Sequence, residues 1–162
     1  MMELRASFQG MGFTDVATLI QSGNVVFSSK VASKSKLTDR IEKALSKDFG
    51  YDSRVVLASA KELALVVAQA PSGFGKDKDK YRYDVLFVKE PMTTNEALAQ
   101  VTTKPGVDEA RAGKHALYFR RLISKAAQSH LSKLVQRPVY KSLTIRNWNT
   151  TTKLFEMMSP KI

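Results

Sequence analysis

The chain has 162 residues and a net charge of +11, and its residues are 43% hydrophobic and 25% charged. These proportions are typical of a globular protein and exclude a disordered or fibrous one. The absence of cysteine excludes disulfides, thiolate nucleophiles and cysteine-ligated zinc, and favours a cytoplasmic location. No uncharged apolar run approaches the about 20 residues of a membrane span, so we expect no membrane partner.

The first part of the chain is predicted to contain two helices and three strands. Their order is helix 1–11, strand 16–21, strand 24–29, helix 34–49 and strand 54–58. Ser22 and Gly23 join the first two strands and predict a hairpin turn. In the second helix, Leu37, Ile41 and Leu45 fall on one face, which predicts an amphipathic helix against a core.

The second part is predicted to alternate strands and helices and to end in an extra helix. After a connecting helix 60–70 and a polar loop 73–80, the order is strand 81–88, helix 93–101, strand 107–112, strand 115–121, helix 124–135, strand 142–146 and helix 148–158. In helix 124–135, the apolar spacing predicts four inward and four outward side chains. The inward residues are Ala127, Leu131, Leu134 and Val135, and the outward residues are Lys125, Gln128, Ser129 and Lys133.

These orders predict an α+β protein made of two ferredoxin-like βαββαβ units, the first without its opening strand. We expect a first half over 1–59, a connecting helix and loop over 60–80, and a second half over 81–162. The missing strand would leave the middle of the first sheet without hydrogen-bond partners. Three explanations stay open: residues precede Met1 in the native protein, another segment or chain fills the gap, or the sheet is rearranged. The sequence favours the first.

Three stretches resemble the bacterial family called domain of unknown function 1697. They are residues 19–27 (LIQSGNVVF), 83–87 (YDVLF) and 144–154 (TIRNWNTTTKL), of which the last is the most specific. The resemblance implies a duplicated ferredoxin-like architecture and implies no activity. Members of that family usually open with an extra strand and an Arg-Gly-Ile-Asn type of turn, which this sequence lacks.

Positive charge is concentrated in the last third of the chain. Between Lys114 and Ile162 there are ten Lys or Arg residues and one acid, Glu156, whereas the preceding residues have sixteen bases and fourteen acids. Such asymmetry predicts a face that meets an anionic partner. The predicted basic patch consists of Arg120, Arg121, Lys125, Lys133, Arg137 and Lys141.

Two turns are candidate anion sites. At the start of the last helix, Arg146 and the free N–H groups after Asn147 suit an anion, with Thr150 and Lys153 one turn later. The alternative is that Asn147 caps the helix and Trp148 packs in the core. The turn amides of Ser22, Gly23 and Asn24 form the second candidate, for which an ordinary hairpin turn is the alternative.

Other chemistry has little support in the sequence. Residues 73–76 resemble a phosphate loop but lack its first glycine and its final Ser or Thr. The alternating Lys and Asp residues of 76–80 and the separated His115 and His130 predict no metal site. Tyr81, Tyr83, Phe87 and Tyr118 are candidate stacking platforms for bases or, alternatively, core residues.

Three functions therefore stay open. The first is a binding module for nucleic acid or a phosphorylated small molecule, without a cofactor, through the basic C-terminal half. The second is an enzyme that holds a small anionic substrate between the halves with Arg146 and Lys153. The third is a structural or interaction protein whose basic surface serves solubility.

Overall fold

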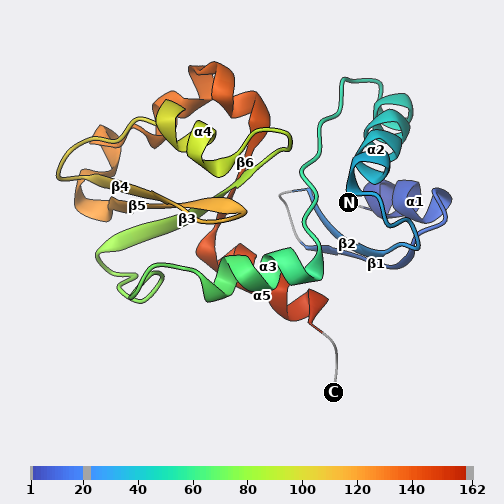
Figure 1. The fold of residues 1–162 in the computed structure, drawn as a ribbon, viewed down its shortest axis with the longest axis horizontal. Helices are drawn as coiled ribbons and strands as arrows, with labels where there is room; N and C mark the ends of the chain where they lie inside the picture. The colour runs from blue at the N-terminus through green and yellow to red at the C-terminus, as the bar shows by residue number, and fades with distance from the viewer. Residues whose placement is uncertain (1, 20–22, 160–162) are drawn as a thin grey trace. The chain divides into compact units, whose positions relative to one another are not determined.

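The computed structural model describes residues 2–19 and 23–159. They form two compact units, of which the first ends at Leu57 and the second runs from Ala58 to Ser159 (Figure 1). The boundary lies near residue 59, where the first half was expected to end. The residues 60–80, expected to connect the halves, belong to the second unit.

The first unit packs two helices against a two-stranded antiparallel sheet. It contains α1 (Met2–Gly10), β1 (Thr14–Leu19), β2 (Asn24–Ser28) and α2 (Lys34–Phe49), close to the predicted ranges. Its core joins Phe8 of α1, Phe13 and Phe27, whose ring centroids lie 4.6–5.9 Å apart, to the buried Ile41 and Leu45 of α2. Burial of this apolar surface holds the helices on the sheet.

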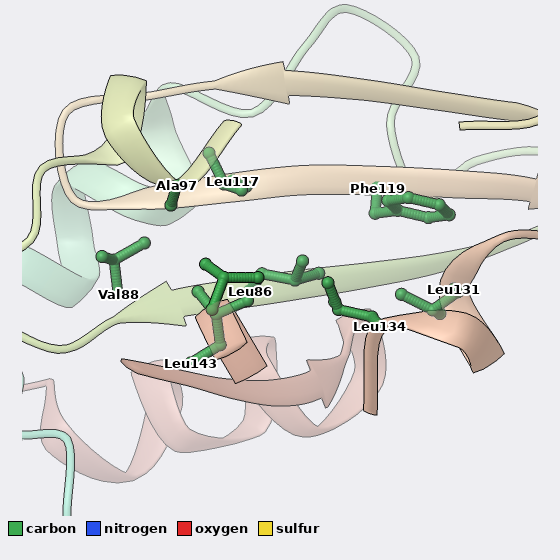
Figure 2. Close-up of a cluster of buried hydrophobic side chains, with 9 residues drawn as sticks. Leu86, Val88, Ala97, Leu117, Phe119, Leu131, Leu134 and Leu143 are labelled. Atoms are coloured by element: carbon green, nitrogen blue, oxygen red, sulfur yellow. The ribbon is translucent and has the colours of Figure 1, made fainter. Parts of the chain in front are cut away.

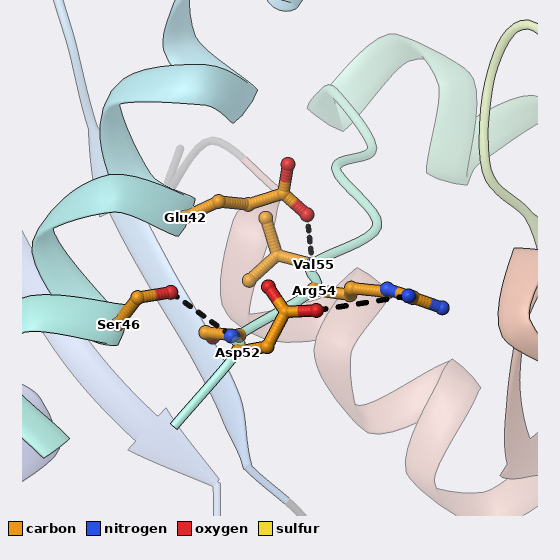
Figure 3. A network of polar contacts seen from close by, with 6 residues as sticks. Glu42, Ser46, Asp52, Arg54 and Val55 are labelled. Atoms are coloured by element: carbon orange, nitrogen blue, oxygen red, sulfur yellow. Dashed lines mark hydrogen bonds and ion pairs between the residues drawn. The ribbon is translucent and has the colours of Figure 1, made fainter. Parts of the chain in front are cut away.

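Residues 54–58 do not form the predicted strand. A ladder needs a neighbouring strand, and within the described residues β1 and β2 alone make up this sheet. Backbone N–H groups in this segment and just before it instead donate to side chains of α2, as Figure 3 shows. Ser53 N–H donates to Ser46 Oγ at 2.9 Å and Val55 N–H to Glu42 Oε2 at 3.0 Å. The chain thus stays extended beside α2 without joining a sheet.

The second unit contains a four-stranded antiparallel sheet with the order β4-β5-β3-β6. Its strands are β3 (Tyr81–Val88), β4 (Asp108–Ala112), β5 (Ala116–Leu122) and β6 (Leu143–Asn147). The opening strand β3 lies between β5 and β6, which is the central position expected for it. The helices are α3 (Ala60–Ala68), α4 (Thr94–Gln100) and α5 (Trp148–Met158), all at predicted positions.

Helical segments cover both faces of this sheet (Figure 1). Side chains alternate along β3, so Leu86 faces one side and Tyr83 the other. Figure 2 shows Leu131 and Leu134 on the Leu86 side, where they join the main core with Ala97 of α4. On the Tyr83 side lie α3 and α5.

The predicted α-helix over 124–135 is wrong. The chain forms three 3-10 helices instead: η1 (Ile123–Gln128), η2 (Leu131–Gln136) and η3 (Pro138–Ser142). The backbone is extended at Ser129 and again at Arg137, where the following Pro138 disfavours the α-helical conformation. Leu131 and Leu134 are buried as expected, because their spacing of three residues also suits a 3-10 helix.

Three side chains of this segment lie on the side opposite to the prediction. Ala127 and Val135, expected inward, are exposed, and Ser129, expected outward, is only 2% exposed. The hydroxyl of Ser129 donates to Asp108 Oδ1 at 2.5 Å, which draws this residue into the structure. A contact between residues far apart in sequence therefore overrides the helical pattern.

The loop after α3 is anchored at one end. Lys76–Lys80 residues are exposed, as expected for a polar loop, but Gly75 is buried against the indole ring of Trp148. Phe74 packs edge-to-face on Trp148, with ring centroids 5.1 Å apart. The first part of the loop, expected to be exposed, is thus part of the packing on the Tyr83 side.

The fold as a whole is α+β with two separate sheets. Within the described residues the first unit lacks the predicted third strand, so the duplication of a complete ferredoxin-like unit is not confirmed. Among the described residues, none of the helices combines the length and the apolar character that a membrane crossing requires.

Candidate functional site

A basic surface covers the three 3-10 helices of residues 123–142. Its position depends on Asp108 at the start of β4, whose carboxylate accepts hydrogen bonds from two adjacent residues of the segment. Ser129 Oγ donates to Oδ1, and the backbone N–H of His130 donates to Oδ2 at 2.8 Å. Lys104 N–H donates to the same Oδ2 at 2.9 Å. The carboxylate therefore ties the middle of the segment to the sheet.

Four cations project from this segment into solvent. Lys125, Lys133, Arg137 and Lys141 are all exposed, and residues 123–142 contain no acid. Val135 and Tyr140 are also exposed here, by 57% and 38% of their surface. The basic surface, defined as Lys125, Lys133, Val135, Arg137, Tyr140 and Lys141, therefore combines positive charge with an apolar and an aromatic side chain.

The two arginines at the end of β5, Arg120 and Arg121, do not belong to the basic surface. Adjacent residues of a strand face opposite sides of the sheet. Arg120 lies on the Tyr83 side, where it pairs with Glu109 at 2.6 Å. Arg121 lies on the other side, opposite Asp108 and Arg82 in the strand register. Four of the six residues predicted as a basic patch thus lie within the segment 123–142.

Arg121 lies near the partly buried carboxyl of Asp84. Burial raises the pKa of the Asp84 carboxyl, while the positive charges of Arg121 and Arg82 oppose this shift. Asp84 Oδ2, Arg121 Nε and His130 Nδ1 are buried and have no hydrogen-bond partner among the described residues. This end of the sheet therefore contains charge that is incompletely compensated by protein groups.

The candidate site at the start of α5 shows the capping arrangement. Asn147 Oδ1 accepts the N–H of Thr150 at 2.8 Å, and Lys78 Nζ donates to Asn149 Oδ1 at 3.1 Å. Arg146 NH1 donates to Thr144 Oγ1 and to the Ile145 carbonyl. Burial lowers the pKa of Arg146, and the neighbouring Tyr140 opposes the shift. Lys153 is exposed. Anion binding at this helix start stays a prediction.

The hairpin turn is described only in part. Gly23 has a positive φ of 65°, and Asn24 opens β2 and is 8% exposed. Ser22 lies outside the described residues. A turn glycine in the left-handed region is what an ordinary hairpin needs, so anion binding by this turn also stays a prediction.

The aromatic residues of β3 and β5 are mostly core residues. Tyr83, Phe87 and Tyr118 are between 3% and 8% exposed, so most of each ring is covered by the protein and does not form an open stacking surface on the sheet. Tyr81 is half-buried, and the Arg120 guanidinium lies 4.2 Å from its ring centroid. The exposed aromatic residue of the basic surface is Tyr140, which the strand pattern did not indicate.

No group of three or more His, Asp or Glu side chains that could hold a metal ion occurs in the described part of the chain. Sequence reasoning missed Asp108, which positions the basic surface, and Tyr140, which belongs to it. The acid-free run 123–142 indicated the surface, whereas the contacts of Asp108 depend on tertiary structure.

Comparison with known proteins gives the family. The family model described as protein of unknown function (DUF1697) matches residues 1–118. The fold is similar to the solved structure of a conserved bacterial protein, SP0830, from Streptococcus pneumoniae, with a TM-score of 0.84 and 24% identity over 98% of this chain and 88% of that chain. Among curated proteins no relative matches. Because the family model covers well over half of its residues, the chain belongs to the DUF1697 family.

Proposed function

We propose that the second unit binds single-stranded nucleic acid on the basic surface. The observation that supports this function is the exposure of four cations on a segment without any acid. Phosphates attract such cations, and displaced counterions drive the association. Tyr140 and Val135 lie among the cations, and an exposed ring offers a stacking surface to an unpaired base.

The fold of the second unit is compatible with nucleic-acid binding. We also propose that this unit is a ferredoxin-like βαββαβ unit in which 3-10 turns replace the second helix. The central position of β3 between β5 and β6 supports it. Ferredoxin-like domains that bind RNA usually use exposed aromatics of the sheet. The strand aromatics are mostly buried here, so the proposal rests on the exposed 3-10 segment instead.

The test measures the salt dependence of binding to a fluorescent 20-mer of single-stranded DNA or RNA. Each phosphate contact to a single strand contributes about −0.7 to the slope of log K against log salt. Four contacts therefore predict a slope of about −2.8 and an affinity loss of about 50-fold between 50 and 200 mM salt. An affinity independent of salt over this range contradicts the proposal.

A matched pair of triple variants separates this surface from net charge. Replacing Lys125, Lys133 and Lys141 by alanine should reduce the slope to about −0.7. Replacing Lys36, Lys43 and Lys47, which are exposed on α2, removes the same charge from the first unit and should leave the slope unchanged. Equal effects of the two variants would show that only overall charge matters.

A third variant tests the preference for unpaired bases. Tyr140→Leu should weaken single-strand binding about fivefold or more, while Tyr140→Phe should bind like the native protein, because both aromatic rings can stack. Binding to a duplex of the same length should be unaffected by either change. Equal affinity for duplex and single strand, without an effect of Tyr140→Leu, counts against the stacking contact.

A further inference from the structure

A cavity of about 230 Å³ opens on the Tyr83 side of the second unit, on the sheet face opposite to the 3-10 helices. Two parts of the chain form it: the sheet strands β3, β4 and β5, and the segment that follows α3. Its lining residues are Pro71, Ser72, Phe74, Tyr83, Glu109, Arg111, Tyr118 and Arg120. Of these, Tyr83 and Tyr118 were candidate stacking platforms and Arg120 belonged to the predicted basic patch, whereas the sequence did not indicate that they share a cavity.

The inner part of the cavity is aromatic. Phe74 packs edge-to-face against Tyr83 and Tyr118, with ring centroids 4.8 and 5.5 Å away. Both tyrosine hydroxyls are already used by the protein. The Tyr83 hydroxyl accepts the N–H of Asp77 at 3.1 Å, and the Tyr118 hydroxyl donates to the Val66 carbonyl. The aromatic walls therefore offer a ligand mainly apolar contact.

Two arginines and one glutamate form the polar part. In the strand register Glu109 lies opposite Arg120, and Arg111 lies opposite Tyr118. Glu109 Oε1 accepts from Arg111 at 3.1 Å and Oε2 pairs with Arg120 at 2.6 Å. One carboxylate between two guanidinium groups leaves a local charge of one positive unit, from the charges these groups have at neutral pH.

The two arginines differ in what they can offer. Arg120 is held by Glu109 and by the ring of Tyr81, 4.2 Å away. Arg111 is 66% exposed, and its contact with Glu109 uses one of its nitrogens. Its remaining N–H donors have no protein acceptor among the described residues, so they can take a carboxylate or a phosphate in two parallel hydrogen bonds.

We infer that this cavity is a binding site for a small aromatic acid, a single ring that bears a carboxylate or a phosphate. The ring contacts Phe74, Tyr83 and Tyr118, and the anionic group binds Arg111. The volume lies below the range of about 300–1,000 Å³ that is usual for drug-sized ligands, which favours one ring. This site is separate from the basic surface and does not depend on nucleic-acid binding.

The experiment titrates the whole protein with benzoate and with phenyl phosphate, and with benzamide as a neutral control. Trp148, the only tryptophan, packs on Phe74 and reports through its fluorescence, and NMR shifts of residues lining the cavity locate the ligand. We expect one or both acids to bind at least about tenfold more tightly than benzamide. Binding of one acid alone identifies the carboxylate or the phosphate as the required group.

Variants on opposite faces of the sheet separate the two proposals. Arg111→Gln should weaken binding of the acid about tenfold or more without changing the thermal transition, since its side chain is exposed. Arg137→Gln, which alters the basic surface, should leave acid binding unchanged. For the labelled oligonucleotide the order of effects should be reversed, so either proposal can fail while the other holds.

Glu109→Gln should have the opposite effect on acid binding from Arg111→Gln. It removes the negative charge between the two arginines and keeps the shape of the side chain, so acid binding should become several-fold tighter. The inference is overturned if neither acid binds, if benzamide binds equally well, or if NMR shifts appear away from the cavity. Weaker binding by Glu109→Gln together with unchanged binding by Arg111→Gln also overturns it.

Discussion

Gly75 allows the loop after α3 to pack against Trp148 within the second unit, and its replacement should be costly. Its φ is +84°, in the region that favours glycine, and an added Cβ would lie closer than 3.0 Å to the indole of Trp148. Gly75→Ala should therefore lose about 1–2 kcal/mol from the backbone conformation. Overpacking against the ring should add about 1–3 kcal/mol. The expected total loss is about 2–5 kcal/mol.

Gly73→Ala provides the matched control. Gly73 also has a positive φ, +78°, but a Cβ there has no neighbour within 4 Å. This variant should lose only the backbone part, about 1–2 kcal/mol. Urea unfolding followed by Trp148 fluorescence measures both, and a typical m-value of about 2 kcal/mol/M predicts midpoints that differ by about 0.5–1.5 M. Equal losses for the two variants would refute the contact with Trp148.

Three further predictions concern other contacts. Tyr118→Phe should lose about 1 kcal/mol, since the buried hydroxyl donates to the Val66 carbonyl. Burial also raises the pKa of Tyr118 to about 12, whereas a tyrosine of the unfolded chain loses its proton near pH 10. The native protein should therefore lose stability between about pH 10 and 12, and the variant should lose less. Asp84→Asn should raise the urea midpoint at pH 7 more than at pH 3, because burial raises the pKa of Asp84 and ionisation then opposes folding as pH rises. Ser46→Ala should cost about 1 kcal/mol and speed amide exchange at Ser53, whose N–H would lose its acceptor.

Each of these predictions has an outcome that contradicts it. For Tyr118, it is a Phe variant with the same alkaline loss as the native protein. For Asp84, it is a lower midpoint at pH 7, or a gain of equal size at pH 3; Asp79→Asn, on an exposed residue, serves as the control. For Ser46, it is unchanged exchange at Ser53 in a variant that remains folded.

Local patterns predicted most helices and strands of this fold. Helix α2 was predicted over its full length because its apolar residues repeat at helical spacing, and in the structure Ser33 caps its start and Gly50 its end. The predictions for two segments were wrong, because contacts with residues far away in the sequence decide their structure. Residues 54–58 have strand composition but no partner strand in the described sheet. Residues 124–135 have helical spacing, which the bond between Ser129 and Asp108 interrupts.

The candidate sites were predicted less well than the fold. The charge of the 123–142 segment follows directly from its composition, and Lys125 and Lys133 are exposed as expected. The cavity on the other face depends on the register of β4 and β5, which places Glu109 beside Arg120. The register of two strands cannot be derived from the order of elements along the sequence. The arrangement of Arg111 and Arg120 around the carboxylate of Glu109 could therefore not be predicted.

The division of residues 123–142 into three separate 3-10 helices affects how this region responds to local unfolding and to substitutions. Each turn closes within a few residues, and buried side chains attach two of the turns separately, Leu131 and Leu134 in η2 and Val139 in η3. Opening one turn therefore does not unwind the next, as fraying would in a continuous α-helix. The segment should tolerate substitutions at the exposed positions between its buried residues. The charge and chemistry of its surface can therefore change while the fold of the second unit stays the same.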